Sequence, residues 1–284
     1  MSTQVNISEN LQIRQERLDE HHAVEELTRD TFWDKLWGAE DGQICDEHLL
    51  VHRLRTSPAL VPELNLVAVL GGKLVGHIIY TKSKIVSDTG TSHEMLTFGP
   101  LSVRPGYQGL GIGRALMSHS FAVAKGLGYR AVLIFGHADY YPRVGFRRAA
   151  EFGITTHDGK IFDPFMAYPL YDGAMDGIQG RYYLDPVYEG LTQEDAREFD
   201  KRFPARELFT PAPIGVLLER LEPAAREAVA GLGFRSIGMM QTKSERELLA
   251  LDGVDACAIS TIKAVMREYY YRWGAPGELC IPDV

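Results

Sequence analysis

Hydrophobic and polar positions follow two periods in the first part of the chain, and together they predict a mixture of helices and strands. A helical period runs from about residue 19 to 37 and again from about 46 to 54. Runs rich in β-forming residues predict strands, and Gly71 and Gly72 between two of these runs predict a hairpin. The predicted strands cover residues 11–15, 65–70, 73–81, 95–103, 164–170 and 180–184.

Residues 98–135 carry the pattern of a βαβ unit. A strand ending at Val103 leads through a glycine-rich segment into a helix that ends near Leu127. The continuous apolar run over 131–135 is typical of a strand buried on both faces. The two strands should therefore be parallel neighbours within a mixed sheet.

The pattern changes after Tyr188. A helix over 191–203, opened by Thr192, is followed by a linker containing three prolines, and the period beyond the linker is helical throughout. These shifts predict a flexible N-terminus over 1–10, a first domain over 11–190, a helical linker over 191–215, a small all-α C-terminal module over 216–273 and a tail over 274–284.

Composition places the chain among ordinary globular proteins. Its 284 residues, 45% hydrophobic and 24% charged, suffice for about two domains. A net charge of −8 argues against a nucleic-acid or anionic-membrane binder, because phosphate neutralisation needs basic surface. Cys45, Cys257 and Cys280 form no C-x-x-C pair, so no disulfide framework or thiolate zinc site is expected. The N-terminus is polar and no apolar run approaches ~20 residues, so we expect a reduced, cytoplasmic protein without a membrane span.

The glycine-rich segment has the character of an anion site. It follows a strand and opens a helix, where unsatisfied amides and the helix dipole favour a phosphate. The dinucleotide fingerprint G-x-G-x-x-G fails, because Arg114 stands in place of the third glycine, and the P-loop pattern lacks its Gly-Lys-Ser/Thr. The pyrophosphate-binding pattern Q/R-x-x-G-x-G/A is met in full by Gln108, Gly111 and Gly113.

Three motifs in order carry a family resemblance: the strand end Leu-Ser-Val-Arg-Pro at 101–105, the glycine loop, and Tyr-Pro-Arg-Val-Gly-Phe at 141–146. Over about residues 11–190 the chain resembles the GNAT superfamily of acyl-CoA-dependent N-acyltransferases. The resemblance implies an α/β (α+β) fold, with a mixed, mostly antiparallel sheet, a central βαβ unit and helices on both faces. It also implies acetyl-CoA as cosubstrate and an amine as acceptor.

The resemblance also implies roles for individual residues. The strand backbone at Leu101 and Val103 would hold the pantetheine arm and thioester, and Tyr141 would be the general acid that protonates the departing thiolate. The alternative for Tyr141 is a packing tyrosine beside its aromatic neighbours. The residues that would hold the pyrophosphate are Gln108, Gly109, Leu110, Gly111, Ile112, Gly113 and Arg114.

Histidines supply the candidates for a general base and for a metal site. His137 follows the strand over 131–135, near the end where open α/β sheets bind ligands, and its pKa range suits a base. A surface histidine with a water relay is the alternative. His119 is interpreted as a buried core histidine. His48 and His52 stand four apart on a predicted helix, but no third ligand is evident, so no metal is expected.

Aromatic and charged residues add two further expectations. The stripe of Phe32, Trp33 and Trp37 is interpreted as core packing rather than acceptor contact. Residues 101–150 hold seven basic residues against Asp139 alone, a net charge of +6, whereas the rest of the chain carries −14. A basic segment around a phosphate-binding loop favours a small polyanionic cofactor such as coenzyme A.

The C-terminal module is similar to a helix-hairpin-helix fold, and its nearest likeness is the C-terminal domain of the RNA polymerase α subunit. The likeness rests on the glycine-hydrophobe pattern over 231–238 and on the turn over 251–255 before a helix. Asp255 replaces a glycine that would contact phosphate, and acidic and basic residues balance over 221–273. Nucleic acid is therefore not expected as a partner, and docking to a protein or homodimerisation is favoured.

Together these patterns predict an acetyl-CoA-dependent N-acetyltransferase that transfers an acetyl group to a primary amine of a small molecule or peptide by direct attack. The alternative is a non-catalytic acyl-CoA-binding regulatory protein that acts through its C-terminal module. A tyrosine at position 141 favours the enzyme, since binding alone needs no acid.

Overall fold

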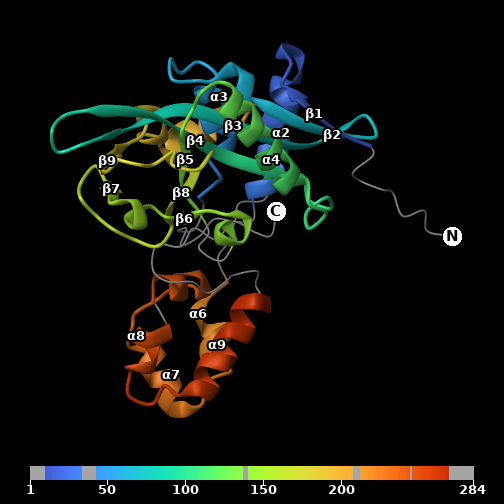
Figure 1. Cartoon of the computed structure of the whole chain (residues 1–284). Coiled ribbons are helices and arrows are strands. Elements are labelled where there is room, and N and C mark those ends of the chain that lie inside the picture. Colours follow the sequence, from blue (N-terminus) through green and yellow to red (C-terminus); the bar gives the residue numbers. More distant parts are fainter. Residues whose placement is uncertain (1–9, 34–42, 137–139, 207–211, 244, 269–284) are drawn as a thin grey trace. The chain divides into compact units, whose positions relative to one another are not determined.

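The computed structural model describes residues 10–33, 43–136, 140–206, 212–243 and 245–268 (Figure 1). Within these ranges, residues up to 205 belong mainly to one compact unit and residues 212–268 belong to a second. The domain boundaries expected from the sequence stay predictions.

The first unit is built on one mixed sheet. Its main path follows the order β1-β2-β3-β4-β5-β8-β6, while β9 pairs with both β3 and β7. Only the β4–β5 and β7–β9 pairs are parallel among the described strands, which confirms the predicted parallel neighbours and the mostly antiparallel sheet. The strands are β1 Leu11–Gln15, β2 Leu66–Leu70, β3 Lys73–Val86, β4 Ser92–Val103, β5 Ala131–Phe135, β6 Arg147–Arg148, β7 Ile154–Thr156, β8 Phe165–Pro169 and β9 Gly180–Tyr183.

Strands β3 and β4 are longer than the pattern predicted, and a second hairpin turn joins them. The expected end of β3 was residue 81, but alternation continues beyond it, with Lys82 and Lys84 exposed and Ile85 buried. The prediction stopped where charged side chains begin to face solvent. The short strands β6 and β7 were not predicted at all, because two or three residues carry too little periodicity.

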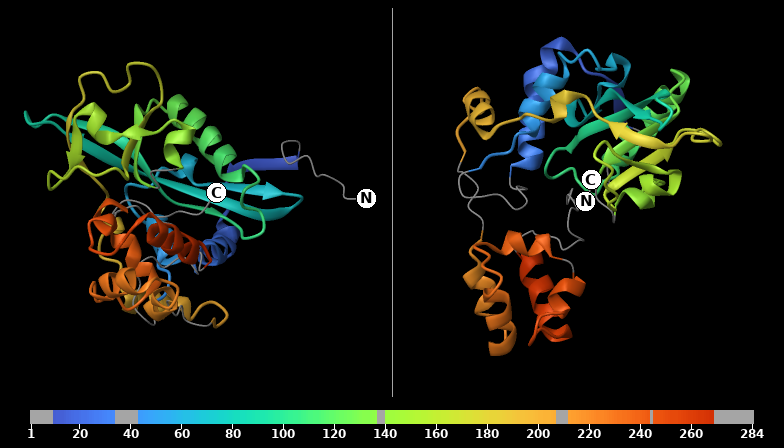
Figure 2. Two further views of the ribbon diagram at one scale, coloured as in Figure 1. Left: turned by 90° about the horizontal axis from the view of Figure 1, so that it is seen from below. Right: turned by 90° about the vertical axis from the view of Figure 1, so that its left-hand side faces the viewer.

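Helices cover both faces of this sheet (Figure 2). On β2, Leu66 and Ala68 face the core that contains Ile112 and Leu116 of α4 (Ile112–Gly126). Val67 points to the other face, where it packs with Val24 of α2 and Val51 of α3. The two-residue period of a strand therefore distributes the helices between the two faces. The other helical segments of this unit are η1 Leu18–Glu20, α2 His21–Phe32, α3 Glu47–Leu54, η2 Pro62–Leu64, η3 Tyr141–Val144, η4 Ala149–Phe152, η5 Pro186–Tyr188 and α5 Gln193–Asp200.

Helix α5 begins as its sequence predicts. The side chain of Thr192 accepts a hydrogen bond from the amide of Asp195 at 3.1 Å, which satisfies one of the free donors of the first turn. The helix then docks through Asp200, whose carboxylate binds the buried guanidinium of Arg29 on α2.

The second unit has its own hydrophobic core, made by Leu217, Val229, Ile237, Ile262 and neighbouring side chains. Its helices are short and separated by turns: α6 Ile214–Leu218, α7 Pro223–Ala230, η6 Ile237–Thr242, α8 Glu245–Leu249 and α9 Ala256–Glu268.

In the turn before α9, Asp255 has a role that the sequence did not predict. Oδ1 of Asp255 accepts a hydrogen bond from the amide of Ala258 at 2.8 Å. Asp255 therefore caps α9. Nearby Gly253 has φ +84°, and a Cβ there would lie 2.8 Å from the Cβ of Ala224 on α7, so this close approach requires glycine.

Within the described residues, every helix is too short or too polar to cross a membrane.

Candidate active site

The central feature of the first unit is the divergence of its two parallel strands, β4 and β5. Their ladder consists of one residue pair, Leu96 with Val132. Beyond this pair, β4 continues to Val103 and β5 to Phe135 without pairing to each other. The pairing of β4 with β3 also shifts register between Ile78 and Tyr80. The carboxyl ends of the two strands thus border an opening, which is where open α/β sheets bind ligands.

The loop after β4 is held against the end of that strand by side chains. The carbonyl of Val103 accepts hydrogen bonds from Gln108 Nε2 at 3.0 Å and from Thr31 Oγ1 at 3.1 Å. Arg104 donates from its amide to the carbonyl of Val75 on β3 at 2.9 Å. Gln108 was expected to bind cofactor, and the structure shows its amide group fastening the loop.

The backbone amides of residues 109–113 donate no hydrogen bond within the described loop or the helix. No hydrogen bond from these amides reaches an acceptor in the described residues. Gly111 is the N-cap of α4, with φ +82°, and Gly109 has φ +76°, conformations that favour glycine. Free donors at the start of a helix of 15 residues can bind an anion, and the anion site expected from the glycine pattern stays a prediction.

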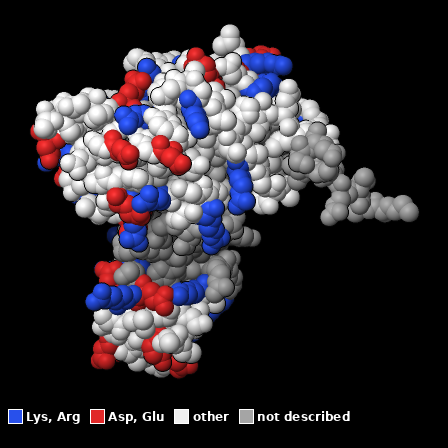
Figure 3. Space-filling view, in the orientation of Figure 1, with Lys and Arg blue, Asp and Glu red and all other residues white. Residues whose placement is uncertain are grey.

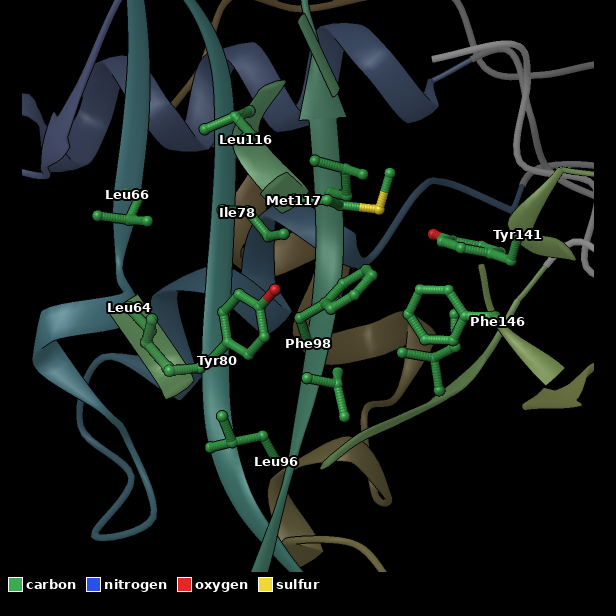
Figure 4. Close-up of a cluster of buried hydrophobic side chains, with 14 of the residues drawn as sticks. Leu64, Leu66, Ile78, Tyr80, Leu96, Phe98, Leu116, Met117, Tyr141 and Phe146 are labelled. Carbon is green, nitrogen blue, oxygen red and sulfur yellow. The ribbon is translucent and has the colours of Figure 1, made fainter. Parts of the chain in front are cut away.

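Tyr141 lies in η3, at the carboxyl end of β5, and is fully buried in the main core. Figure 4 shows its ring beside Phe146 and facing Phe98 of β4, at centroid distances of 5.2 and 6.0 Å. Gly136 directly follows β5, and a Cβ there would lie 2.3 Å from Cε2 of Tyr141. The ring therefore packs between the ends of β4 and β5. Burial raises the pKa of Tyr141 far above its ordinary value, so the phenol stays protonated.

The sequence model of the acetyltransferase (GNAT) family matches residues 21–146 of this chain. Residues 21–146 therefore match a GNAT acetyltransferase domain. An uncharacterized N-acetyltransferase of Escherichia coli K12, YjhQ, is 38% identical over 101 residues. That match covers 36% of this chain and 55% of YjhQ, so the chain matches about half the length of this relative.

The fold of the first unit is similar to a solved structure. The GNAT family N-acetyltransferase YhbS from Escherichia coli, in complex with CoA, superposes with a TM-score of 0.55 at 23% identity. The superposition covers 68% of this chain and 98% of YhbS. This likeness supports the mixed α/β fold expected from the motifs.

Basic residues of the GNAT domain are less concentrated around the loop than the sequence suggested. Three of the seven over 101–150 contact carboxylates: Arg104 with Asp30, Arg147 with Glu151 and Arg148 with Asp163. In Figure 3, basic and acidic side chains interleave across the face in view. Arg114, exposed in the first turn of α4, remains available to an anion at the loop.

The histidines of the GNAT domain fall in three different situations. His137 lies outside the described residues. His119 is exposed, so the prediction of a core histidine was wrong: the buried face of α4 follows Leu116 and Ser120, and position 119 turns away from it. His48 and His52 contact carboxylates, at 3.1 Å from Asp200 and 2.9 Å from Glu25. The described residues contain no cluster of three metal-ligating side chains.

The aromatic stripe on the first helix is only partly described. Phe32 and Trp33 are buried, in agreement with core packing, and Arg29 stacks over the Trp33 ring at 4.3 Å. Trp37 lies outside the described residues.

The sequence did not predict a buried row of polar side chains in the first unit. Cys45 Sγ lies 3.5 Å from His48 Nδ1, and His48 Nε2 lies 3.1 Å from Asp200 Oδ1, close enough for an ion pair although outside the angles of a hydrogen bond. The order thiol, imidazole, carboxylate resembles an activated nucleophile. The thiol is fully buried, however, and burial raises its pKa, while burial lowers the pKa of His48 to about 4. The thiol and the imidazole are therefore neutral and buried, so this row of side chains has a structural role.

Glu47, at the start of α3, is a second titratable group that the sequence did not reveal. Burial, followed by the charge of Asp46, raises the pKa of its carboxyl to about 7. One of its oxygens, Oε2, is buried without a hydrogen-bond partner among the described residues. A carboxyl that titrates near neutrality can accept a proton at physiological pH.

Proposed function

We propose that the chain is an acetyl-CoA-dependent N-acetyltransferase that acetylates a primary amine of a small molecule or peptide. The observation that carries the proposal is the set of free amides at the start of α4, directly beside the divergence of β4 and β5. Tyr141 lies at the same divergence. The family uses acetyl-CoA, and the relative YhbS was solved with CoA.

In this proposal, the amides of Gly109, Leu110, Gly111, Ile112 and Gly113 hold the pyrophosphate. Each free N–H donates to a phosphate oxygen, and the dipole of α4 adds to the attraction. Arg114 contributes a full positive charge. Gln108 acts through the backbone, because its hydrogen bond to Val103 fixes the loop.

The pantetheine arm is expected along the free side of β4. The amide of Arg104 donates toward β3, and successive strand residues point their backbone groups to opposite sides. The amides of Val103 and Leu101 therefore point away from β3, toward the opening. They can hold the pantetheine arm and the thioester carbonyl there.

The chemistry is a direct transfer. The neutral amine attacks the thioester carbonyl, a C–N bond forms, and the C–S bond breaks with departure of the thiolate. Tyr141 donates its proton to the thiolate to give free CoA, and the proton lost by the amine passes to a base. His137 or a water relay is the proposed base.

A thiol-release assay tests this function. Wild-type protein is incubated with acetyl-CoA and a panel of primary amines, and free CoA and acetylated amine are measured together. Equal amounts of both products support the enzyme. If acetyl-CoA binds but no amine yields product, the proposal fails and the non-catalytic acyl-CoA-binding alternative replaces it.

For the second unit, we propose a small all-α module that docks to a protein partner or to a second copy of the chain. Its separate core supports an independent module, and Asp255, occupied in capping α9, gives no support to phosphate contact. Nucleic acid is not a proposed partner. Gel filtration with light scattering, on the full chain and on a chain ending at residue 205, tests self-association through the module.

A further inference from the structure

A cavity of about 270 Å³ lies at the end of β5. Ile134 faces the core shared with α4, whereas Leu133 and Phe135 face the opposite side of the sheet, with Phe165 and Tyr182. Phe135 lines the cavity, which therefore opens on the face of the sheet opposite α4. Part of its lining comes from far along the chain, at Phe162, Tyr182, Leu184 and Glu189.

The cavity borders β5 of the candidate active site directly, and a residue next to its lining contacts β4. Phe135 is followed by Gly136, on which the ring of Tyr141 rests. On the other side, the segment that supplies Leu184 and Glu189 also contains Tyr188, which lies 3.9 Å from the position of a Cβ on Gly99 of β4. The cavity thus lies at the end of β5, and the neighbour of its lining residue Glu189 lies against Gly99 of β4. An acceptor held there would approach the thioester from the face opposite α4.

One part of the cavity wall is aromatic, while another part is made polar by Thr156, His157, Asp158 and Lys160. The rings of Phe135 and Phe162 are nearly parallel, 5° apart in orientation with centroids 5.6 Å apart. Tyr182 meets Phe135 edge to face at 6.0 Å. Aromatic surfaces of this kind favour another flat ring, offset-stacked or edge-on. A volume of 270 Å³ is just below the ordinary range for small-molecule sites, so it suits one ring rather than a larger ligand.

The rim of the cavity carries one carboxylate that pairs with no described cation. Lys160 is occupied by Asp158, at 2.7 Å. Glu189 is exposed and has no ion pair within the described part of the chain. Its negative charge attracts an alkyl ammonium ion to the rim.

We propose that this cavity selects the acceptor, which is a primary amine joined by a short chain to a single aromatic ring. The ring occupies the cavity that Phe135, Phe162 and Tyr182 line, and Glu189 draws the ammonium group toward the opening. This proposal rests on the proposed acetyltransferase function. The same chemistry is found in a free arylalkylamine and in a peptide with an N-terminal aromatic residue.

Steady-state kinetics with matched amines test the selection. The probes are 2-phenylethylamine, 2-cyclohexylethylamine and n-butylamine, and kcat/KM should favour 2-phenylethylamine over n-butylamine by about tenfold. The saturated ring separates aromatic stacking from simple apolar burial. A tripeptide with N-terminal phenylalanine, compared with its N-terminal alanine analogue, distinguishes a peptide source from a free amine.

Two variants and two matched controls locate the effect. Phe162→Ala should raise KM for 2-phenylethylamine about tenfold and leave KM for n-butylamine and acetyl-CoA within about twofold. Phe152→Ala is the control, because Phe152 is also partly buried against the same core but does not line the cavity. Glu189→Gln should raise KM for every cationic amine, and Glu63→Gln, at an exposed glutamate on η2, should not.

The outcomes separate this proposal from the proposed function. Equal kcat/KM for all three amines, or equal losses in Phe162→Ala and Phe152→Ala, overturns the cavity proposal while the enzyme stands. If no amine is acetylated, saturation-transfer NMR of 2-phenylethylamine with the CoA-loaded protein decides. Binding that is lost in Phe162→Ala supports the cavity without catalysis, and absence of binding to wild type overturns it.

Discussion

Replacing Gly111 with alanine tests the anion site at the start of α4. Gly111 has φ +82°, and a Cβ there would meet no atom within 4 Å, so the substitution adds backbone strain without a clash. An L-residue held in this left-handed conformation costs ~1–2 kcal/mol. The free loop can relax to relieve that strain, which turns its amides away from the phosphate. Binding of CoA must then restore the strained conformation.

The affinity for CoA is therefore expected to fall by the strain that the free loop relieves, up to about 5- to 30-fold. Isothermal titration calorimetry measures the dissociation constant, and thermal unfolding measures the loss of stability. Gly90→Ala is the matched control: Gly90 has φ +84° and equally open space, but lies in the turn between β3 and β4. Gly90→Ala should lose stability but no affinity, whereas Gly111→Ala should lose affinity for CoA. Equal dissociation constants for the two variants would refute the assignment of the loop.

Three further predictions follow from buried groups. Tyr141→Phe should lower kcat by about 10²- to 10⁴-fold with little change in KM for acetyl-CoA. The control variant Tyr140→Phe should retain most activity. If kcat of Tyr141→Phe equalled that of the wild type, Tyr141 would not be the acid. Because the pKa of Glu47 is raised to about 7, folding is favoured by its protonated form, and this stability is lost as pH rises from about 4.5 to 7. In denaturant unfolding, Glu47→Gln should remove up to about 3 kcal/mol of that pH-dependent decline; an unchanged pH dependence would contradict the raised pKa of Glu47. Asp200→Ala should destabilise the first unit by ~3–5 kcal/mol because it leaves Arg29 buried and unpaired. Glu198→Gln removes one partner of an exposed ion pair and should cost less than ~1 kcal/mol. Similar losses of stability in the two variants would contradict the role of the buried pair.

Local patterns in the sequence predicted the parts of the site that are local in the structure. The glycine loop, the start of α4 and the parallel β4–β5 pair all lie within about 40 consecutive residues, so their chemistry is visible as spacing. The same is true of Thr192, whose capping role depends only on the next three residues. Burial on a helix was harder to judge: His119 was assigned to the core because one shared face was read too broadly.

Contacts between distant segments could not be predicted from one sequence. The carboxylate of Asp200 meets Arg29 across 171 positions, and no period or motif connects them. The same applies to the aromatic cavity, which combines the end of β5 with segments near residues 160 and 185. Glu47 was missed because its raised pKa depends on burial that only the folded chain provides. The sequence likewise predicted more unpaired positive charge over residues 101–150 than the structure contains, because Arg104, Arg147 and Arg148 each pair with a carboxylate.

The central claim is that the opening between β4 and β5 catalyses acyl transfer from acetyl-CoA to an amine. The most direct measurement incubates the full chain with acetyl-CoA and 2-phenylethylamine, and follows free thiol together with N-acetylated product by mass spectrometry. We predict stoichiometric formation of both products, lost in Tyr141→Phe and weakened at low acetyl-CoA in Gly111→Ala. Thiol release without acetylated product, or an absence of product with every amine in the panel, would contradict the account.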